Sequence, residues 1–448
     1  MIARRRLLGS TGALAGLASL GGLAGLGDAS ASDYRALVVL MLEGGYDGHH
    51  TLVPTDGAFN DYVRARANLA MSRASLVNLP GSSAGHTFAL HPSLAPLAPL
   101  YERGRLAFIA NAGPLLQPCT AAQVIAQQVR LPPFLMAHPE QMAVQAGWLT
   151  ESDNDTSGWG GRTLELLPSP LRHRLAALKA GRFGTTVNGR NSTPTELVAA
   201  GTRWGSANLL NPASQAHQQM AWIGRWQFDN DYQSDCARQF AQAFDDAVAL
   251  TKVLQRATPP QADFENDALA TTLRDIAMAI PQFKAIGYRR QIYQVSWGTF
   301  DTHSEQRGNG PFTQDTQFTT LAKALASFDQ ANIAAGLDSS VALLVLSDFG
   351  RTLRPNSGGG SEHAWGNHLF AIGGPIAGGQ VLGTFPTLML GGPDDSDTAL
   401  GGRFVPTTPT DQIAASLMQW LGLPPAQFDA VFPNLVNFQQ KTIPLLRS

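Results

Sequence analysis

Short apolar runs that border clusters of carboxylates and imidazoles constrain the fold of this chain more than any other feature. Within residues 291–374 the bordering side chains are Asp301, His303, Asp348, His363 and His368. The runs alternate with stretches of helical spacing, and this order predicts an α/β fold with a mostly parallel sheet. Because open α/β sheets bind ligands beyond the carboxyl ends of their strands, these side chains predict a site at that edge, and their types indicate a metal site.

Five apolar runs predict strands, at residues 38–42, 106–110, 292–296, 341–346 and 369–372. Amphipathic stretches predict helices at residues 232–255, 268–285, 316–335 and 411–421. Leu321, Leu325 and Phe328 recur on one face of the third helix, as a helix packed on a sheet requires. Residues 151–231 show few periodicities, so we expect the region near 115–260 to form an insertion or cap beside the sheet.

The first 31 residues have the layout of an export signal. Arg4–Arg6 precede the weakly apolar run Leu7–Gly27, and Ala29–Ala31 fit a small-residue cleavage site. The adjacent arginines indicate twin-arginine export and a periplasmic or secreted protein. The alternative is an N-terminal membrane anchor, although seven glycines in the run make a poor permanent span. No later segment resembles a span, and residues 32–448 are expected to form one domain.

The charge balance and the cysteines exclude several classes. The formal net charge is −2 and there is no basic patch, which argues against a nucleic-acid partner. The two cysteines, Cys119 and Cys236, allow one disulfide in an oxidising compartment without implying it. Two cysteines alone cannot build a structural zinc cluster.

Each polar motif also has a simpler interpretation when it is taken alone. Asp47 follows the first predicted strand among glycines, where it is either a ligand or an acidic turn residue. Asp301 and His303, two residues apart, suit zinc or manganese, but Asp301 could instead cap backbone amides. Asp348 follows an apolar strand, so its charge must be solvated, paired or metal-bound. Arg351 either pairs with Asp348 or grips a phosphate or sulfate.

Histidines gather around the same loops. Six of the ten lie there: His49, His50, His138, His303, His363 and His368. His363 and His368 both precede the last predicted strand, and either one alone is as readily a surface residue. Together with the three aspartates, the group predicts a shared site for one or two metal ions.

Five motifs carry a family resemblance, namely Glu43–Gly48, Phe300–His303, Ser347–Thr352, Glu362–His368 and Phe432–Leu435. With these motifs, nearly the whole mature chain resembles the DUF1501 family, exported bacterial proteins placed in the alkaline phosphatase and sulfatase superfamily. The resemblance implies a three-layer α/β sandwich of the alkaline phosphatase type. It also implies a metal-dependent hydrolase of phosphate or sulfate esters, with an anionic small molecule or glycan as substrate.

The resemblance further implies a ligand set for a divalent metal, zinc first and otherwise manganese, calcium or magnesium. The implied ligands are Asp47, Asp301, His303, Asp348, and His363 or His368, with Arg351 holding the anion. Three departures from the superfamily pattern stand out. Phe349 replaces a common histidine ligand, and Glu362 precedes His363 where relatives more usually have aspartate. Ala137 stands before His138 where many relatives have serine.

A nucleophile is harder to place. Cys119 and Thr120 come just before a predicted helix near Ala121, whose N-terminus would favour a thiolate or oxyanion. The alternative for Thr120 is helix capping. The second function compatible with the sequence is therefore a non-catalytic relative that binds an anionic glycan, a cell-surface component or a partner protein.

Overall fold

We describe a computed structural model of the chain, which covers residues 33–147, 155–197, 211–226 and 228–447. The predicted export signal, residues 1–31, lies outside the described residues. Tyr34–Ser448 form one compact unit.

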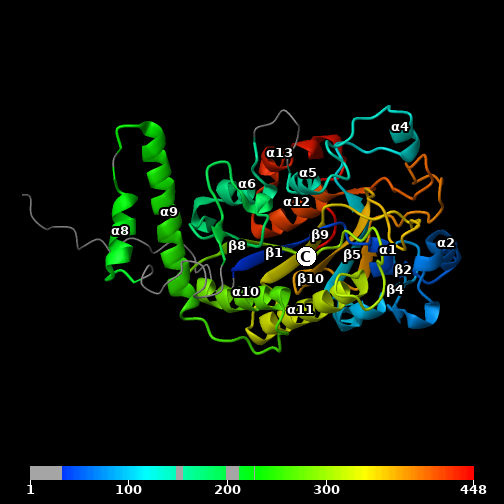
Figure 1. Ribbon diagram of the computed structural model, residues 1–448, viewed down its shortest axis with the longest axis horizontal. Helices are drawn as coiled ribbons and strands as arrows, with labels where there is room; N and C mark the ends of the chain where they lie inside the picture. Colours follow the sequence, from blue (N-terminus) through cyan, green and yellow to red (C-terminus); the bar gives the residue numbers. More distant parts are fainter. Residues whose placement is uncertain (1–32, 148–154, 198–210, 227, 448) are drawn as a thin grey trace, which may run out of the picture. The chain divides into compact units, whose positions relative to one another are not determined.

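A central sheet crosses this unit (Figure 1). Within the described residues its strands follow the order β11 (Gln380–Leu382), β5 (Leu106–Gly113), β10 (Asn367–Gly373), β9 (Val341–Ser347), β1 (Arg35–Leu42), β8 (Arg290–Trp297), β6 (Ala177–Ala180) and β7 (Thr195–Glu196), with β12 (Thr408–Pro409) beside β5. Only β10 runs antiparallel to its neighbours; the other pairs are parallel. The predicted α/β class with a mostly parallel sheet is confirmed.

The central strands are apolar along their whole length because both faces of the sheet are covered. Every residue of β9 and all but the first of β1 are buried, as expected for parallel strands between helical layers. Leu42, the last residue of β1, pairs with Trp297 of β8 and with Ser347 of β9. The three strands therefore end together, and the polar segments that follow them leave from one edge.

Helices cover both faces, as predicted for a three-layer sandwich. Figure 1 shows α10 (Ala268–Ala285) and α11 (Gln314–Ala334) on one side of the sheet, and α12 (Thr410–Leu421) with α6 (Trp159–Leu166) on the other. Of these, α10, α11 and α12, together with α9 (Asp231–Leu254), confirm the four helices predicted from amphipathic spacing. No described helix has both the length and the apolar character needed to cross a membrane.

The region predicted as a cap contributes to the sheet itself. Its elements include α4 (Ala121–Ile125), α5 (His138–Gln145), β6, β7 and α8 (Gln215–Ile223), which packs on α9. β6 pairs with β8, and β7 pairs with β6. These strands have four and two residues, too few to show a period in sequence. Residues 148–154 and 198–210 of this region lie outside the described residues.

Smaller elements complete the fold. The strands β2 (Leu52–Pro54), β4 (Phe88–Leu90) and β3 (Val77–Asn78) form a second sheet. The short helices are α1 (Gly48–Thr51), α2 (Ala58–Arg66), α3 (Ala98–Glu102) and α13 (Phe428–Val431). Cys119 and Cys236 are both free thiols, so the disulfide that the sequence allows is not formed.

Candidate metal centre

A glycine turn draws the ends of β1, β8 and β9 together. Gly44 has a positive φ of 102°, and a Cβ atom at this position would lie 2.4 Å from the backbone nitrogen of Asp301. The amide of Gly44 donates to Asp348 Oδ2 at 3.0 Å, and Glu43 O accepts from the amide of Phe300 at 2.8 Å. Only glycine allows this approach, so the turn after β1 fixes the distance between the two acidic loops.

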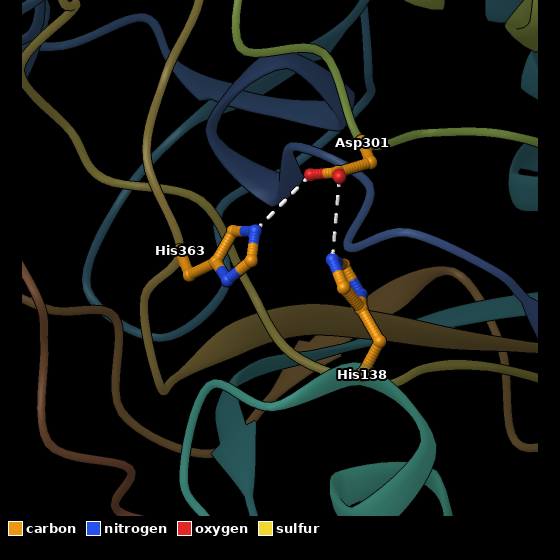
Figure 2. A group of neighbouring side chains, drawn as sticks. All are labelled: His138, Asp301 and His363. Carbon is orange, nitrogen blue, oxygen red and sulfur yellow. Dashed lines mark hydrogen bonds and ion pairs between the residues drawn. The ribbon is translucent and has the colours of Figure 1, made fainter.

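Three side chains from distant parts of the chain meet at this edge (Figure 2). Asp301 follows β8, His363 precedes β10, and His138 opens α5. His363 Nε2 lies 3.1 Å from Asp301 Oδ1, and His138 Nε2 lies 3.4 Å from Asp301 Oδ2. One ligand atom from each residue lies within 4.8 Å of the others. The carboxylate thus faces one imidazole with each oxygen.

The far side of each of these two rings is held by an oxygen acceptor. His138 Nδ1 lies 2.6 Å from Asp348 Oδ2, and His363 Nδ1 lies 2.9 Å from Met136 O. Because a carboxylate and a carbonyl only accept, Nδ1 carries a proton in both rings. The Nε2 atom of His138 has no hydrogen-bond partner among the described residues. Both rings therefore present Nε2 to Asp301, the arrangement typical of metal-bound histidine.

His303 reaches the same carboxylate from the solvent side. Its Nε2 lies 3.0 Å from both Asp301 Oδ1 and His363 Nε2, and its Nδ1 lies 2.8 Å from Glu362 Oε2. With Nδ1 donating to Glu362, its Nε2 lone pair faces that of His363. Two such lone pairs repel at 3.0 Å unless a proton or a metal cation lies between them.

The residues fit a divalent metal. Imidazole nitrogen and carboxylate oxygen suit zinc and other late divalent ions, whereas calcium and magnesium prefer oxygen alone. Asp301 is 43% exposed and His138 is 28% exposed, so a ligand from solvent can reach the group. Burial alone would raise the pKa of Asp301, but its hydrogen bond with Arg351 and the charge of Arg351 lower it to about 2. The carboxylate is therefore ionised and ready to bind a cation at neutral pH.

Asp348, a ligand in the sequence-based set, orients His138 and is not part of the group around Asp301. It is fully buried and accepts from the amides of Gly44 and Phe349 and from the Ser347 hydroxyl, in addition to its contact with His138. Its hydrogen bond raises the pKa of His138 against the opposing effect of burial. The resulting carboxylate–histidine pair fixes the ring from behind.

Asp47 lies in a separate, sealed cluster. Its Oδ2 contacts the guanidinium of Arg66 and accepts from Gln306 Nε2 at 2.7 Å, while Oδ1 accepts from the amide of His49 at 3.0 Å. Burial would raise the pKa of Asp47, yet the charge of Arg66 holds it well below its usual range. His50 is also buried there, 3.6 Å from the carboxylate. None of these described contacts involves Asp301, His138 or His363.

His368 is likewise apart from the group around Asp301. Its Nδ1 accepts from the amide of Asn111 at 3.1 Å, and its ring stacks on Phe385 with centroids 4.9 Å apart. Burial lowers its pKa well below the usual value, so the ring is neutral. Of the two histidines that the sequence offered for the last ligand, His363 is the one beside Asp301.

Arg351 faces inward. Its guanidinium has no exposed surface and donates to the carbonyls of Gly45, Ser361 and Phe300 at 2.8, 2.9 and 3.1 Å, besides contacting Gly44 O and Asp301. The predicted anion grip would need donors that point to solvent. Here those donors join three loops and hold Asp301.

The two candidate nucleophiles lie at the start of α4. Thr120 is exposed and forms a capping box with Gln123, so the capping alternative is the one its contacts match. Burial raises the pKa of the Cys119 thiol, which keeps it protonated at neutral pH. Neither side chain shows the activation that a nucleophile requires.

Two residues of these clusters escaped the sequence-based ligand set. His138 was noted among the loop histidines but received no role, because nothing in its spacing links it to Asp301. Arg66 ends α2 one helical turn after Tyr62, on the buried face of that helix, but its spacing does not identify Asp47 as its partner. One local signal marks His138. It is the first residue of α5 and precedes Pro139, a position at which helix formation itself does not require histidine.

Together these features define an α/β protein with a histidine–aspartate centre at the carboxyl edge of its parallel strands. The chain belongs to the family described as "Protein of unknown function (DUF1501)", which it matches over residues 34–395. A search of curated proteins finds no match.

Solved structures that match this chain include the lipoteichoic acid synthase LtaP from Listeria monocytogenes, with 9% identity, 91% of this chain and 77% of that chain covered, and a TM-score of 0.33. The PsFucS1 sulfatase from Pseudoalteromonas sp. matches with 10% identity, coverages of 85% and 71%, and a TM-score of 0.32. The phosphonate monoester hydrolase SpPMH from Silicibacter pomeroyi matches with 11% identity, coverages of 87% and 74%, and a TM-score of 0.30. Matches at these identities and TM-scores assign no activity to this chain.

Proposed function

We propose that this protein is an exported metal-dependent hydrolase of phosphate or sulfate esters. The observation that carries the proposal is the convergence of imidazole Nε2 atoms from His138, His303 and His363 on the Asp301 carboxylate. Three or four protein ligands with solvent on one side are the pattern of a catalytic metal site, whereas structural sites are closed. The arginine-rich start of the chain supports export.

Zinc is the proposed metal, with manganese next, because the donors are mostly imidazole nitrogens. When bound, such an ion supplies Lewis-acid polarisation of an ester oxygen and activates water. The residues of the chain prepare the site for it. Asp348, Glu362 and Met136 O hold the three rings in one tautomer, and Arg351 holds Asp301.

The test is metal analysis paired with hydrolysis assays on an aryl phosphate, an aryl phosphodiester and an aryl sulfate. Zinc-loaded protein should turn over one of the three, and Asp301→Ala should lose both the metal and the turnover. Because Asp301 also pairs with the buried guanidinium of Arg351, circular dichroism must first show that the variant is folded. Glu305→Gln is the matched control, because Glu305 is an exposed acid in the same loop. Loaded protein that is inactive on all three esters would contradict the proposal.

A second function is favoured by three observations on the candidate nucleophiles and the candidate anion grip. The hydroxyl of Thr120 caps a helix, the Cys119 thiol is protonated, and Arg351 is buried. A protein without an activated side-chain nucleophile or an open anion grip can still use a metal centre to bind an anionic glycan or a protein partner. Metal-dependent retention on an immobilised sulfated polysaccharide, without any hydrolysis, would select this function.

A further inference from the structure

A cleft of about 930 Å³ lies beside the start of β6. Ala176 and Ala177 of its lining lie at that start, and Thr193 comes just before β7. Because β6 runs parallel to β8, whose far end leads to Asp301, the cleft lies at the amino edge of these strands and the metal centre lies at the carboxyl edge. A ligand in the cleft would therefore occupy a second site.

Positive charge predominates in the cleft. Its lining has four arginines and two acids, namely Arg172, Arg174, Arg190 and Arg238 with Asp235 and Asp246. Arg238 pairs with Asp235 at 2.8 Å and Arg174 contacts Asp246, but the two arginine side chains are 70% and 46% exposed. Arg172 donates to a backbone carbonyl at 3.5 Å. Ion pairs this exposed are weak because water competes for both charges, so these arginines can turn to a ligand.

The loop that carries Arg190 is held in shape by Glu165. Its carboxylate accepts from the amides of Arg190 and Asn191 at 3.2 and 2.8 Å and from the Ser192 hydroxyl at 2.7 Å. Arg190 and Asn191 are exposed, and both belong to the lining of the cleft. The loop thus presents a guanidinium and an amide on a backbone that is already ordered, which reduces the entropy lost on binding.

One face of α9 forms the opposite wall. Asp235, Gln239, Gln242 and Asp246 of the lining follow one another at helical spacing, and Tyr232 lies one turn before Asp235 on the same face. The side chain of Tyr232 is 79% exposed. An aromatic ring therefore extends the polar wall of the cleft with a flat apolar surface.

We propose that this cleft binds a polysaccharide whose sugars carry sulfate, phosphate or carboxylate groups. The arginines would bind the anionic groups through paired N–H donors, the amide side chains would bind hydroxyls, and Tyr232 would pack on a sugar ring. The volume is near the upper end of the roughly 300–1,000 Å³ of small-ligand pockets, which gives room for several sugars. The inference goes beyond the proposed function and does not rest on hydrolysis.

Isothermal titration calorimetry of the full-length protein tests the cleft with dextran sulfate, alginate oligomers and neutral dextran. A chelator in every sample keeps the metal centre empty. The protein should bind the two charged polymers and not neutral dextran. Arg172→Gln combined with Arg238→Gln should weaken this binding about tenfold, because two guanidinium groups that grip anions are lost.

The control removes two exposed arginines outside the cleft, through Arg64→Gln with Arg103→Gln. Arg103 precedes β5, at the other end of the sheet from β6. Because salt screens distant charges, the control should weaken binding less than about twofold. Equal losses in the two folded double variants, or no binding by the wild type, would overturn the inference.

Tyr232→Ala distinguishes a polysaccharide from an acidic polypeptide. It should weaken the binding of dextran sulfate about threefold through the lost contact with a sugar ring. Phe312→Ala, which removes an aromatic side chain that is 70% exposed and lies outside the cleft, should change nothing. Polyglutamate that binds as tightly as dextran sulfate, with no effect of Tyr232→Ala, would mean that the ligand is a polypeptide and that the inference is wrong.

The chelator separates this inference from the proposed function and from the second candidate, which needs metal to retain a glycan. Binding with the chelator present, together with zinc-loaded protein that hydrolyses no ester, supports the cleft and contradicts the hydrolase. Hydrolysis by zinc-loaded protein that binds no charged polymer under chelator contradicts the cleft alone.

Discussion

Asp47, after β1, and Asp301, after β8, hold similar positions in the fold but lie in opposite surroundings. Asp47 and Asp301 both follow strands that finish at the same edge, and both contact an arginine. Asp301 is 43% exposed and keeps its oxygens directed at imidazoles, whereas Asp47 is fully buried and its oxygens are taken by protein donors. A carboxylate becomes a metal ligand only if its surroundings leave its charge available to a cation from solvent.

The two arginines explain the difference. Arg351 divides its donors among several carbonyls and touches Asp301 from the buried side, leaving the opposite side open. Arg66 and Gln306 both bind the same oxygen of Asp47 in a space that solvent does not reach. The pair of Arg351 and Asp301 therefore leaves a carboxylate open to a metal ion, whereas the pair of Arg66 and Asp47 does not.

The largest expected effect comes from breaking the closed pair. Arg66→Met should lower the free energy of unfolding by about 3–5 kcal/mol, because it leaves the Asp47 charge buried and uncompensated. Arg64→Met on the same helix is the control: Arg64 is 78% exposed and pairs with Asp61 at the surface, so its loss should be slight. Urea denaturation of both variants measures the difference. Equal effects would mean that Arg66 does not compensate a buried charge.

The next effect concerns the open centre. Asp348→Asn should weaken zinc binding by about 10–100-fold, the usual result of removing a carboxylate behind a metal-bound histidine. Competition with a chromophoric chelator measures the affinity, and a changed visible spectrum of the cobalt form would show the loosened His138 ring.

Asp329→Asn is the control for that experiment. Asp329 is a buried carboxylate bound to Arg105 at 2.7 Å, so its loss should reduce stability and leave zinc affinity unchanged. If Asp329→Asn weakens zinc binding as much as Asp348→Asn, the effect is one of general stability.

The parts of the fold and of the metal centre that could be predicted from the sequence are those that depend on single segments. The continuous apolar runs of β1 and β9 identified buried parallel strands, because both faces of such strands are covered. The positions of Asp301, His303 and His363 beside strand ends placed them at one edge, where the structure brings them together. These are properties of single segments and the order in which they occur.

The tertiary pairings could not be predicted in this way. Helical spacing places Arg66, unlike exposed Arg64, on the same face of α2 as buried Tyr62, but nothing local identifies Asp47 as the partner of Arg66. The direction of the Arg351 side chain depends on carbonyls from three loops, and the approach of His138 depends on where α5 packs. The spacing of motifs predicts which residues lie at the edge of the sheet. The tertiary contacts of each side chain decide whether it binds a metal or holds another residue in place.

Acid titration sharpens the comparison further, with a smaller effect. The pKa of Asp47 is depressed in the folded protein, so the stability it contributes is present above its unfolded pKa of about 3.9 and is lost as the pH falls. The unfolding free energy of the wild type should therefore decline from pH 5 to pH 2 more steeply than that of Asp47→Asn. Urea titrations across this range measure both slopes, and parallel curves would contradict the assignment.

The smallest effect should come from the solvent-side pair, His303 with Glu362. Both side chains are more than 40% exposed, at 42% and 45%, and a pair so exposed is worth little because water competes for it. Glu362→Gln keeps an oxygen acceptor near His303 Nδ1, so zinc affinity should fall less than about threefold, in contrast to Asp348→Asn. The same chelator competition compares the two variants directly. A loss as large as that of Asp348→Asn would mean that His303 binds the metal as firmly as His138, and that the open side of the centre is narrower than its exposure indicates.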